Sequence, residues 1–290
     1  MAPMAPKTVL ALRPAHRDDI GDLITRRPVP GPGVEQIDPF LFLNHHGPQT
    51  YGPNNAGLPF GPHPHRGFET VTFILAGELA HRDSAGHESV IRAGGVQWMT
   101  AGSGLIHAEV SPEAFKQAGG PLELLQLWVN LPARLKMTQP RYVGLQAGQI
   151  PVITVDQGAA AVSLISGSWG GHEGPIPSLT GVFMSTIALK AGGRAGFGSL
   201  SGRSVFLYVV SGEVKVNGAP VPAWTLAELD LAGDGVEIVA GKDSVVLFGH
   251  AEPIDEPVFA HGPFVMNTRQ EIVDAIADYN AGLFDHVSAA

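Results

Sequence analysis

Residues Thr70–Gly86 read TVTFILAGELAHRDSAG, and this stretch decides the fold. The apolar and β-branched run Thr70–Leu75 ends at Gly77, and Glu78–Arg82 follows before a turn at Asp83–Gly86. Short apolar runs bounded by glycine-containing turns are typical of antiparallel strands joined in hairpins. The stretch therefore predicts two paired strands.

A second stretch repeats this pattern farther along the chain. Residues Ser204–Pro220 read SVFLYVVSGEVKVNGAP, again an apolar-rich run, then Gly-Glu, an apolar residue and a glycine-containing turn. When the two stretches are aligned, Gly77-Glu78 matches Gly212-Glu213. Repetition of a strand–turn–strand unit indicates a duplicated β-domain.

The composition agrees with many short strands. The chain has 290 residues, of which 37 are glycine and 24 are proline, and this content favours tight turns over long helices. We expect an all-β protein with one domain at residues 1–140 and another at 141–290, after an irregular stretch of about 35 residues. Further strands are expected at Pro39–Leu43, Ser89–Ile91, Gly95–Met99, Leu105–Val110, Leu122–Leu131, Thr180–Leu189, Ser204–Val210, Glu213–Val216, Glu237–Ala240 and Ser244–Phe248.

A helix is expected near the end of the sequence. Thr268 and Glu271 have the spacing of a capping box, and Gly282 can end the helix. The apolar residues between them fall at helical spacing and should cover one of the domains: Ile272, Ala275, Ile276 and Tyr279.

Charge and cysteine content exclude several classes of function. The net charge is -9 and the 18 lysines and arginines are scattered, so direct binding to nucleic acid is not expected. The sequence has no apolar run long enough for a signal peptide or a membrane span. Cysteine is absent, so a metal would need His, Asp or Glu ligands. We expect a cytoplasmic monomer.

Histidines gather in the first part of the chain. His63 and His65, like His107 and Glu109, are two residues apart, and in a strand such pairs point to the same face. If the two short strands are neighbours, three imidazoles and one carboxylate converge on one point. This pattern indicates a metal site, although a single His-x-His pair is more often structural.

Other polar residues compete for a role in this site. Glu69 shares the parity of His65 but lies roughly 13 Å away along a regular strand, so we expect it to be a polar residue that supports the site or acts as a base. His45 and His46 are expected in a solvated turn, and His81 and His87 are expected to be exposed beside a hairpin turn.

Several motifs resemble those of a known family. Gly57-x5-His63-x-His65-x3-Glu69 and Gly102-x-Gly104-x2-His107 are similar to the two cupin motifs. Gly77 closes the first motif one residue late, and Gly102 replaces the usual proline of the second. The longer strings PFLFLNHHGP, HPHRGFETVTFILAGE, GVQWMTAGSGLIHAE, LQLWVNLP and GPFVMNTRQEI together resemble pirin, a bicupin family, over residues 38–284.

The resemblance implies a fold and a metal site. The fold would be two cupin-type antiparallel β-barrel (jelly-roll) domains with a short C-terminal helix. A single iron would lie in the N-terminal barrel, bound by His63, His65, His107 and Glu109. The alignment that joins Gly77 to Gly212 places Gly198 and Leu200 at the positions of His63 and His65, so the C-terminal barrel is expected to be metal-free.

The resemblance also leaves two classes of function open. The first is a flavonol (quercetin) 2,3-dioxygenase that uses Fe(II), with Glu109 or Glu69 as the base and a small aromatic substrate. The alternative is a non-enzymatic, iron redox-sensing regulator that binds a metabolic enzyme or a transcription factor. Mn, Co, Ni, Cu or Zn could also occupy such a ligand set. Cupins support many chemistries, including isomerases and hydrolases, so the fold does not identify the substrate.

Overall fold

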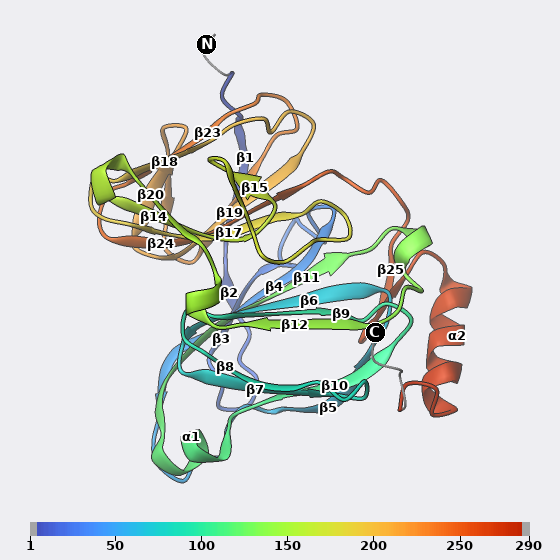
Figure 1. Ribbon diagram of the computed structural model, residues 1–290. Helices are drawn as coiled ribbons and strands as arrows, with labels where there is room; N and C mark the ends of the chain where they lie inside the picture. The colour runs from blue at the N-terminus through green and yellow to red at the C-terminus, as the bar shows by residue number, and fades with distance from the viewer. Residues whose placement is uncertain (1–4, 286–290) are drawn as a thin grey trace. The chain divides into compact units, whose positions relative to one another are not determined.

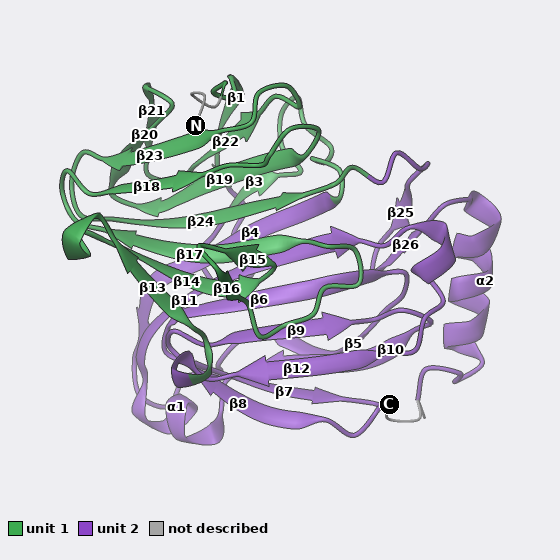
Figure 2. Ribbon diagram, turned by 45° about the horizontal axis from the view of Figure 1, so that its top comes forward, with its two compact units in different colours: residues 1–16, 27–39, 149–253 green, residues 17–26, 40–148, 254–290 purple. Residues whose placement is uncertain are grey.

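The computed structural model describes residues 5–285, and most of its regular structure is β-strand (Figure 1). The chain divides into two compact units, each assembled from three segments of sequence (Figure 2). Unit 1 contains residues 1–16, 27–39 and 149–253, and unit 2 contains residues 17–26, 40–148 and 254–290. The all-β class is thus confirmed, whereas a division at residue 140 stays a prediction.

Unit 2 contains two sheets and a C-terminal hairpin. The larger sheet has the strand order β12-β9-β6-β11-β4-β3-β2, and the smaller has the order β5-β10-β7-β8. The strands are β2 (His16–Arg17), β3 (Thr25–Val29), β4 (Phe40–Tyr51), β5 (Phe60–His65), β6 (Phe68–Ala76), β7 (Glu78–Asp83), β8 (Glu88–Arg92), β9 (Val96–Thr100), β10 (Leu105–Val110), β11 (Gly120–Asn130), β12 (Arg141–Leu145), β25 (Phe259–His261) and β26 (Phe264–Met266). β2 and β3 continue across the limits of the unit.

Unit 1 has the same two-sheet plan. Its larger sheet has the order β1-β22-β19-β24-β17-β14-β13, its smaller sheet the order β18-β23-β20-β21, and β15 pairs with β16. The strands are β1 (Val9–Pro14), β13 (Val152–Val155), β14 (Ala160–Ser166), β15 (Ser168–Trp169), β16 (His172–Glu173), β17 (Phe183–Leu189), β18 (Arg194–Phe197), β19 (Ser204–Ser211), β20 (Glu213–Val216), β21 (Ala219–Pro222), β22 (Thr225–Leu229), β23 (Val236–Ala240) and β24 (Ser244–Ala251).

The two strand orders confirm the predicted duplication. The strands β9-β6-β11-β4 of unit 2 correspond to β22-β19-β24-β17 of unit 1, and β5-β10-β7-β8 corresponds to β18-β23-β20-β21. β12 lies beside β9 in one unit, and β1 occupies the equivalent edge beside β22 in the other. Each unit is therefore the two-sheet sandwich expected of a cupin-type domain.

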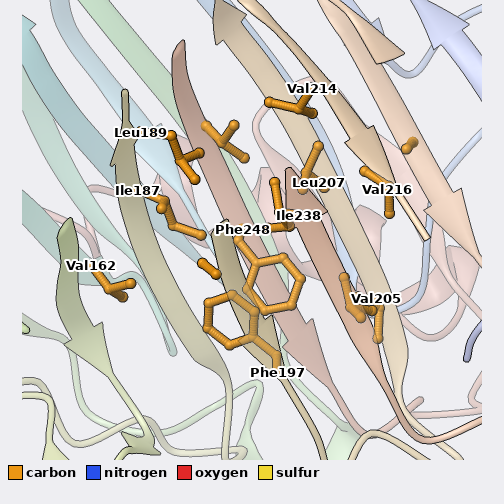
Figure 3. Packing of buried hydrophobic residues seen from close by; sticks show 14 of the residues in the cluster. Val162, Ile187, Leu189, Phe197, Val205, Leu207, Val214, Val216, Ile238 and Phe248 are labelled. Carbon is orange, nitrogen blue, oxygen red and sulfur yellow. The ribbon is translucent and has the colours of Figure 1, made fainter. Parts of the chain in front are cut away.

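Unit 1 is held together by an apolar core between its two sheets (Figure 3). Phe197 of β18 stacks on Phe248 of β24 with ring centroids 4.2 Å apart, and aliphatic side chains surround the pair. Alternate residues of β18 and β23 are buried, as expected for strands with one face on the core. Full burial of each such side chain contributes about 1.5 to 3 kcal/mol.

The C-terminal helix has the predicted start. α2 spans Arg269–Asn280, and Thr268 and Glu271 form both hydrogen bonds of the capping box. Ile272 and Ala275 are buried and pack with Phe264 of β26. A short helix, α1 (Glu113–Ala118), and three 3-10 turns complete the regular structure of residues 5–285: Ala133–Leu135, Ala147–Gln149 and Asp156–Gly158. No helix in residues 5–285 combines the length and apolar character that a membrane span requires.

The beginning of the chain differs from the prediction. Instead of an irregular stretch, it contains β1, β2 and β3. Leu10 and Leu12 of β1 are exposed, so the apolar residues of this strand do not mark its buried face. The prolines at positions 28, 30 and 32 come at or just after the end of β3, where their lack of a backbone donor is tolerated.

Candidate metal centre

Two neighbouring strands bring three imidazoles together. β5 and β10 pair antiparallel, with His107 opposite His63 and Leu105 opposite His65. The three ring centroids are 4.5 to 4.9 Å apart. In the described part of the chain, His63, His65 and His107 are the only three His, Cys, Asp or Glu residues whose ligand atoms all lie within 4.8 Å of one another. The pairing that the sequence required of these strands is confirmed.

Hydrogen bonds fix which nitrogen of two of these rings is available. His63 Nδ1 lies 2.7 Å from the carbonyl oxygen of Gly61, and His65 Nδ1 lies 3.2 Å from that of Pro263. A carbonyl only accepts hydrogen bonds, so each Nδ1 carries a proton and donates it. Each Nε2 then keeps its lone pair, which is the form that binds a metal ion.

Burial keeps the imidazoles of His65 and His107 neutral. Burial, followed by the nearby charge of His63, lowers the pKa of His65 to about 3. Burial and the neighbouring histidines also lower the pKa of His107 well below its usual value. Both rings are therefore in the unprotonated, metal-binding form at neutral pH.

His107 provides the clearest test of whether an ion fits. Its side chain is buried, and neither Nδ1 nor Nε2 has a hydrogen-bond partner within residues 5–285. A buried polar atom without a partner costs about 1 to 3 kcal/mol, which binding to an ion would offset. Nitrogen ligands about 2.1 Å from a shared ion lie roughly 3 to 4 Å apart, so small movements would complete the site. The triad could hold a metal ion.

Glu109 is near the triad, but its carboxylate oxygens do not belong to the cluster of ligand atoms. It is buried two residues after His107, on the same face of β10. Its Oε1 accepts a hydrogen bond of 2.8 Å from Thr72 Oγ1, and its Oε2 accepts one of 2.5 Å from Gln126 Nε2. The two donors belong to β6 and β11, so the larger sheet orients the carboxylate of the smaller one. The role of Glu109 as a fourth ligand stays a prediction.

Glu69 lies on the other face of β6. It is three residues from Thr72 and directly follows Phe68, whose ring is 5.0 Å from that of His65, so its side chain points away from the triad. Burial raises the pKa of Glu69 to about 7, and Thr100 Oγ1 donates a 2.6 Å hydrogen bond to its Oε1. Its catalytic role stays a prediction that this placement does not support.

Four histidines differ from the expected solvated positions. His45 and His46 lie in β4 and are buried, the first bound to Glu123 at 2.9 Å and the second to Thr25 at 2.9 Å. His81 is also buried, and the His87 side chain is only 30% exposed. Glycine and proline just after His45 and His46 indicated a turn, but β4 extends through both histidines. His81 lies in β7, whose burial alternates, and it takes one of the inward positions.

His81 belongs to a polar cluster beside the triad that the sequence did not reveal. His81 Nε2 lies 2.9 Å from Asp83 Oδ2, and its ring stacks on Tyr142 at 4.0 Å. His87 binds the same carboxylate at 3.0 Å. The ring of His81 is 5.5 Å from that of His107. Only the register of β7 against β10, which places Asp83 opposite His107, brings these residues to the site.

Aromatic side chains form a wall on the other side of the triad. The Trp128 ring is 5.4 Å from that of His65 and packs on Phe42 and Phe68 at 4.7 and 4.5 Å. Its Nε1 is buried and has no hydrogen-bond partner within residues 5–285. Trp98 lies opposite Val71 in the β6–β9 pairing and so shares the face of Glu69 instead.

Comparisons with known proteins agree with this architecture. The family model described as "Pirin" matches residues 22–129, and that described as "Pirin C-terminal cupin domain" matches residues 184–285. A pirin-like protein of Caulobacter vibrioides is 41% identical over 87% of this chain and 90% of its own length. Human pirin is 37% identical over 88% of this chain and 85% of its own length. The crystal structure of a quercetin 2,3-dioxygenase from Acinetobacter baumannii superposes with a TM-score of 0.91, at 34% identity over 97% of this chain and 99% of that one.

Proposed function

This chain belongs to the pirin family, and we propose that it is a flavonol 2,3-dioxygenase that uses one iron(II) ion bound in unit 2. The observation that carries the proposal is the triad of the half-buried His63 with the buried His65 and His107, and the orphaned nitrogens of His107. The likeness to a protein described as a quercetin 2,3-dioxygenase supports the choice of substrate class.

Glu109 completes the proposed ligand set. Three imidazoles and a carboxylate suit Fe(II) and leave further coordination positions for exogenous ligands. Iron(II), when bound, supplies a Lewis acid and a one-electron couple with which dioxygen and a flavonol can react. Thr72 and Gln126 hold both carboxylate oxygens of Glu109, so its orientation is fixed before an ion binds.

The residues around the triad would bind and orient the substrate. A flat aromatic ring system fits against the wall of Phe42, Phe68 and Trp128. The free Nε1–H of Trp128 is a donor for a substrate oxygen. Glu109 is the carboxylate nearest in sequence to the triad on its buried face, and it would accept the proton of a flavonol hydroxyl group. We assign this role to Glu109 rather than Glu69, because Glu69 points to the other face of β6.

The test is reconstitution with iron(II) followed by exposure to air. We expect loss of quercetin, measured by its absorbance, together with release of carbon monoxide. His63→Ala should abolish both, and Arg134→Ala, in the turn at Ala133–Leu135, is a control outside the proposed site that should change neither. Iron-loaded protein that leaves flavonols intact would contradict the enzyme proposal and favour the regulator that binds a protein partner. Metal analysis of natively purified protein separates iron from the other candidate ions.

A further inference from the structure

One metal ligand is oriented by a residue from the opposite end of the sequence. His65 Nδ1 donates to the carbonyl oxygen of Pro263, far later in the chain. By contrast, His63 is oriented by Gly61 of its own strand. Loss of the Pro263 contact would free the His65 ring to rotate and to change tautomer, and both changes weaken a metal ligand.

Backbone contacts hold this late segment in register with the ligand strand. Arg66 and Phe264 form a parallel bridge, in which the Val265 amide donates to the Arg66 carbonyl at 3.0 Å. Lys136 Nζ binds the carbonyl oxygens of both Gly67 and Val265, at 2.8 and 3.0 Å. A Cβ atom at position 67 would lie 2.0 Å from the Val265 oxygen, so this approach requires glycine.

The helix α2 fastens the segment to both ligand-bearing strands. The buried guanidinium of Arg66 donates to Asp278 Oδ2 of α2 at 2.8 Å and to the Ser103 carbonyl at 2.7 Å, and it lies 4.6 Å over the ring of Phe284. Phe284 also packs against Gly104, just before β10. Figure 1 shows α2 beside the ends of β5 and β10. The helix therefore contacts the residue that follows His65, and Phe284, just beyond the end of the helix, contacts the turn that precedes the strand of His107.

We propose that residues 263–284 are a clamp that positions the metal ligands, so that release of α2 lowers the affinity of the site for its ion. The inference rests on the metal centre of the proposed function, but not on its reaction or substrate. In it, Arg66, Pro263 and Asp278 are positioning residues that act through His65. Because linkage is reciprocal, binding of the ion must stabilise α2 to the same extent. A partner that draws α2 away would thereby release the ion.

The experiment compares two charge-neutralising substitutions in the same helix. Asp278→Asn removes the partner of Arg66, whereas Asp274→Asn removes an exposed carboxylate that accepts a 2.9 Å hydrogen bond from Gln270 of the same helix. Binding of Co(II) alone is measured by competition with a chelator, and the d–d spectrum of bound Co(II) reports its coordination. We expect Asp278→Asn to weaken binding about 10-fold and to alter the spectrum, because substitutions behind metal ligands typically cost 10- to 100-fold. Asp274→Asn should match the wild type, and Asp278→Glu should recover part of the loss.

A second measurement keeps the proposal falsifiable if Asp278→Asn is poorly folded. In the wild type, Co(II) should slow amide hydrogen exchange in residues 270–280. The clamp proposal would be contradicted if the two asparagine variants had equal Co(II) affinities and spectra, or if Co(II) did not change hydrogen exchange in α2. Either result would leave the proposed metal centre intact. A wild type that binds no Co(II) would instead refute the metal centre, and the clamp with it.

Discussion

Units 1 and 2 share a strand order but fill the space between their sheets with opposite chemistry. His81 pairs with Glu109 in unit 2, and Val216, at the position equivalent to His81, pairs with Ile238 in unit 1. The position of His107 is then taken by Val236, whose partner Phe197 stands where His63 stands in unit 2. Aliphatic and aromatic side chains in one unit thus replace imidazoles and a carboxylate in the other.

The difference shows that the strand order and the metal site are specified by different residues. Turn glycines and alternating apolar residues are common to both units and set the strand order. The inward residues of two short strands, β5 and β10, decide whether the interior is a core or a ligand set. A polar interior costs stability, because buried imidazoles need partners, and this explains why only a few positions carry them.

The largest expected effect is on metal binding. His107→Ala removes one imidazole of the triad itself, so we expect affinity for Co(II) to fall by more than about 1,000-fold, which corresponds to more than about 4 kcal/mol. Val236→Ala, at the equivalent position of unit 1, should leave affinity and a stoichiometry of one ion per chain unchanged. Elemental analysis and chelator competition on both variants measure this. Two ions per wild-type chain, or loss of the ion from Val236→Ala, would contradict the claim that only unit 2 binds an ion.

The next effect is on the stability of unit 1. Phe197→Ala removes a stacked ring from the core in Figure 3 and should lower the free energy of unfolding by about 4 kcal/mol. Denaturant unfolding of the metal-free protein measures the loss. The variant should still bind Co(II) with wild-type affinity. A weaker ion affinity would mean that the core of unit 1 also supports the triad.

A pH dependence that arises from a buried carboxyl group should belong to unit 2. Because the pKa of Glu69 is raised to about 7, the folded chain binds a proton that the unfolded chain has lost above its ordinary pKa near 4.5. Stability from this group is complete below pH 4.5 and declines as the pH rises to about 7, by about 3 kcal/mol. Glu69→Gln should flatten this decline in denaturant unfolding measured between pH 4 and 8. In unit 1, the residue aligned with Glu69 is Ser204, which has no such titration.

If wild type and Glu69→Gln lose stability in parallel between pH 4.5 and 7, another group causes the decline. Because the buried His65 and His107 of unit 2 and His250 of unit 1 have lowered pKa values and also change stability with pH, the comparison uses the difference between the two proteins rather than either curve.

The smallest expected effect is a difference between two buried lysines in how their replacement changes metal binding. Lys7 of unit 1 donates to four backbone carbonyls at 2.7 to 3.3 Å, and Lys136 of unit 2 donates to two carbonyls and Asn130. Replacement of either by methionine leaves these acceptors unpaired and should cost about 2 kcal/mol of stability. Only Lys136→Met should also weaken Co(II) binding, because Lys136 joins Gly67 to Val265. Equal metal affinity in both variants would argue against that link.

The strands of the duplicated frame and the start of α2 could be predicted because they depend on local signals. The runs ending at Gly77 and Gly212, and the capping box at Thr268, are each set by residues close in sequence. The pair of His63 and His65 was visible for the same reason. The edge strand β1 was not, since its role depends on pairing with β22, which lies near the other end of the sequence.

Features of the site that rest on register could not be predicted. The cluster of His81 and Asp83 is brought to the triad by the pairing of β7 with β10, and a β-bulge between His107 and Glu109 shifts the pairing with β5. The number of residues that separates equivalent positions of the two units is one smaller at His63 than at His81. An alignment with a fixed offset therefore matched His63 to Gly198 instead of Phe197. Glu69 shows the same limit, because sequence parity does not carry across the turn between β5 and β6.

The assignment of β1 to unit 1 and of residues 254–285 to unit 2 has a consequence for biosynthesis. A nascent chain that has exposed only its first half contains the strands with the three imidazoles, but not the carbonyl that orients His65. Its first strand, β1, cannot pair until β22 has been synthesised. Each half thus stays incomplete until distant chain emerges from the ribosome, and such non-local closure slows folding. Truncation at the C-terminus would accordingly destabilise unit 2, most of which is translated first. Truncation at the N-terminus would destabilise unit 1, most of which is translated later.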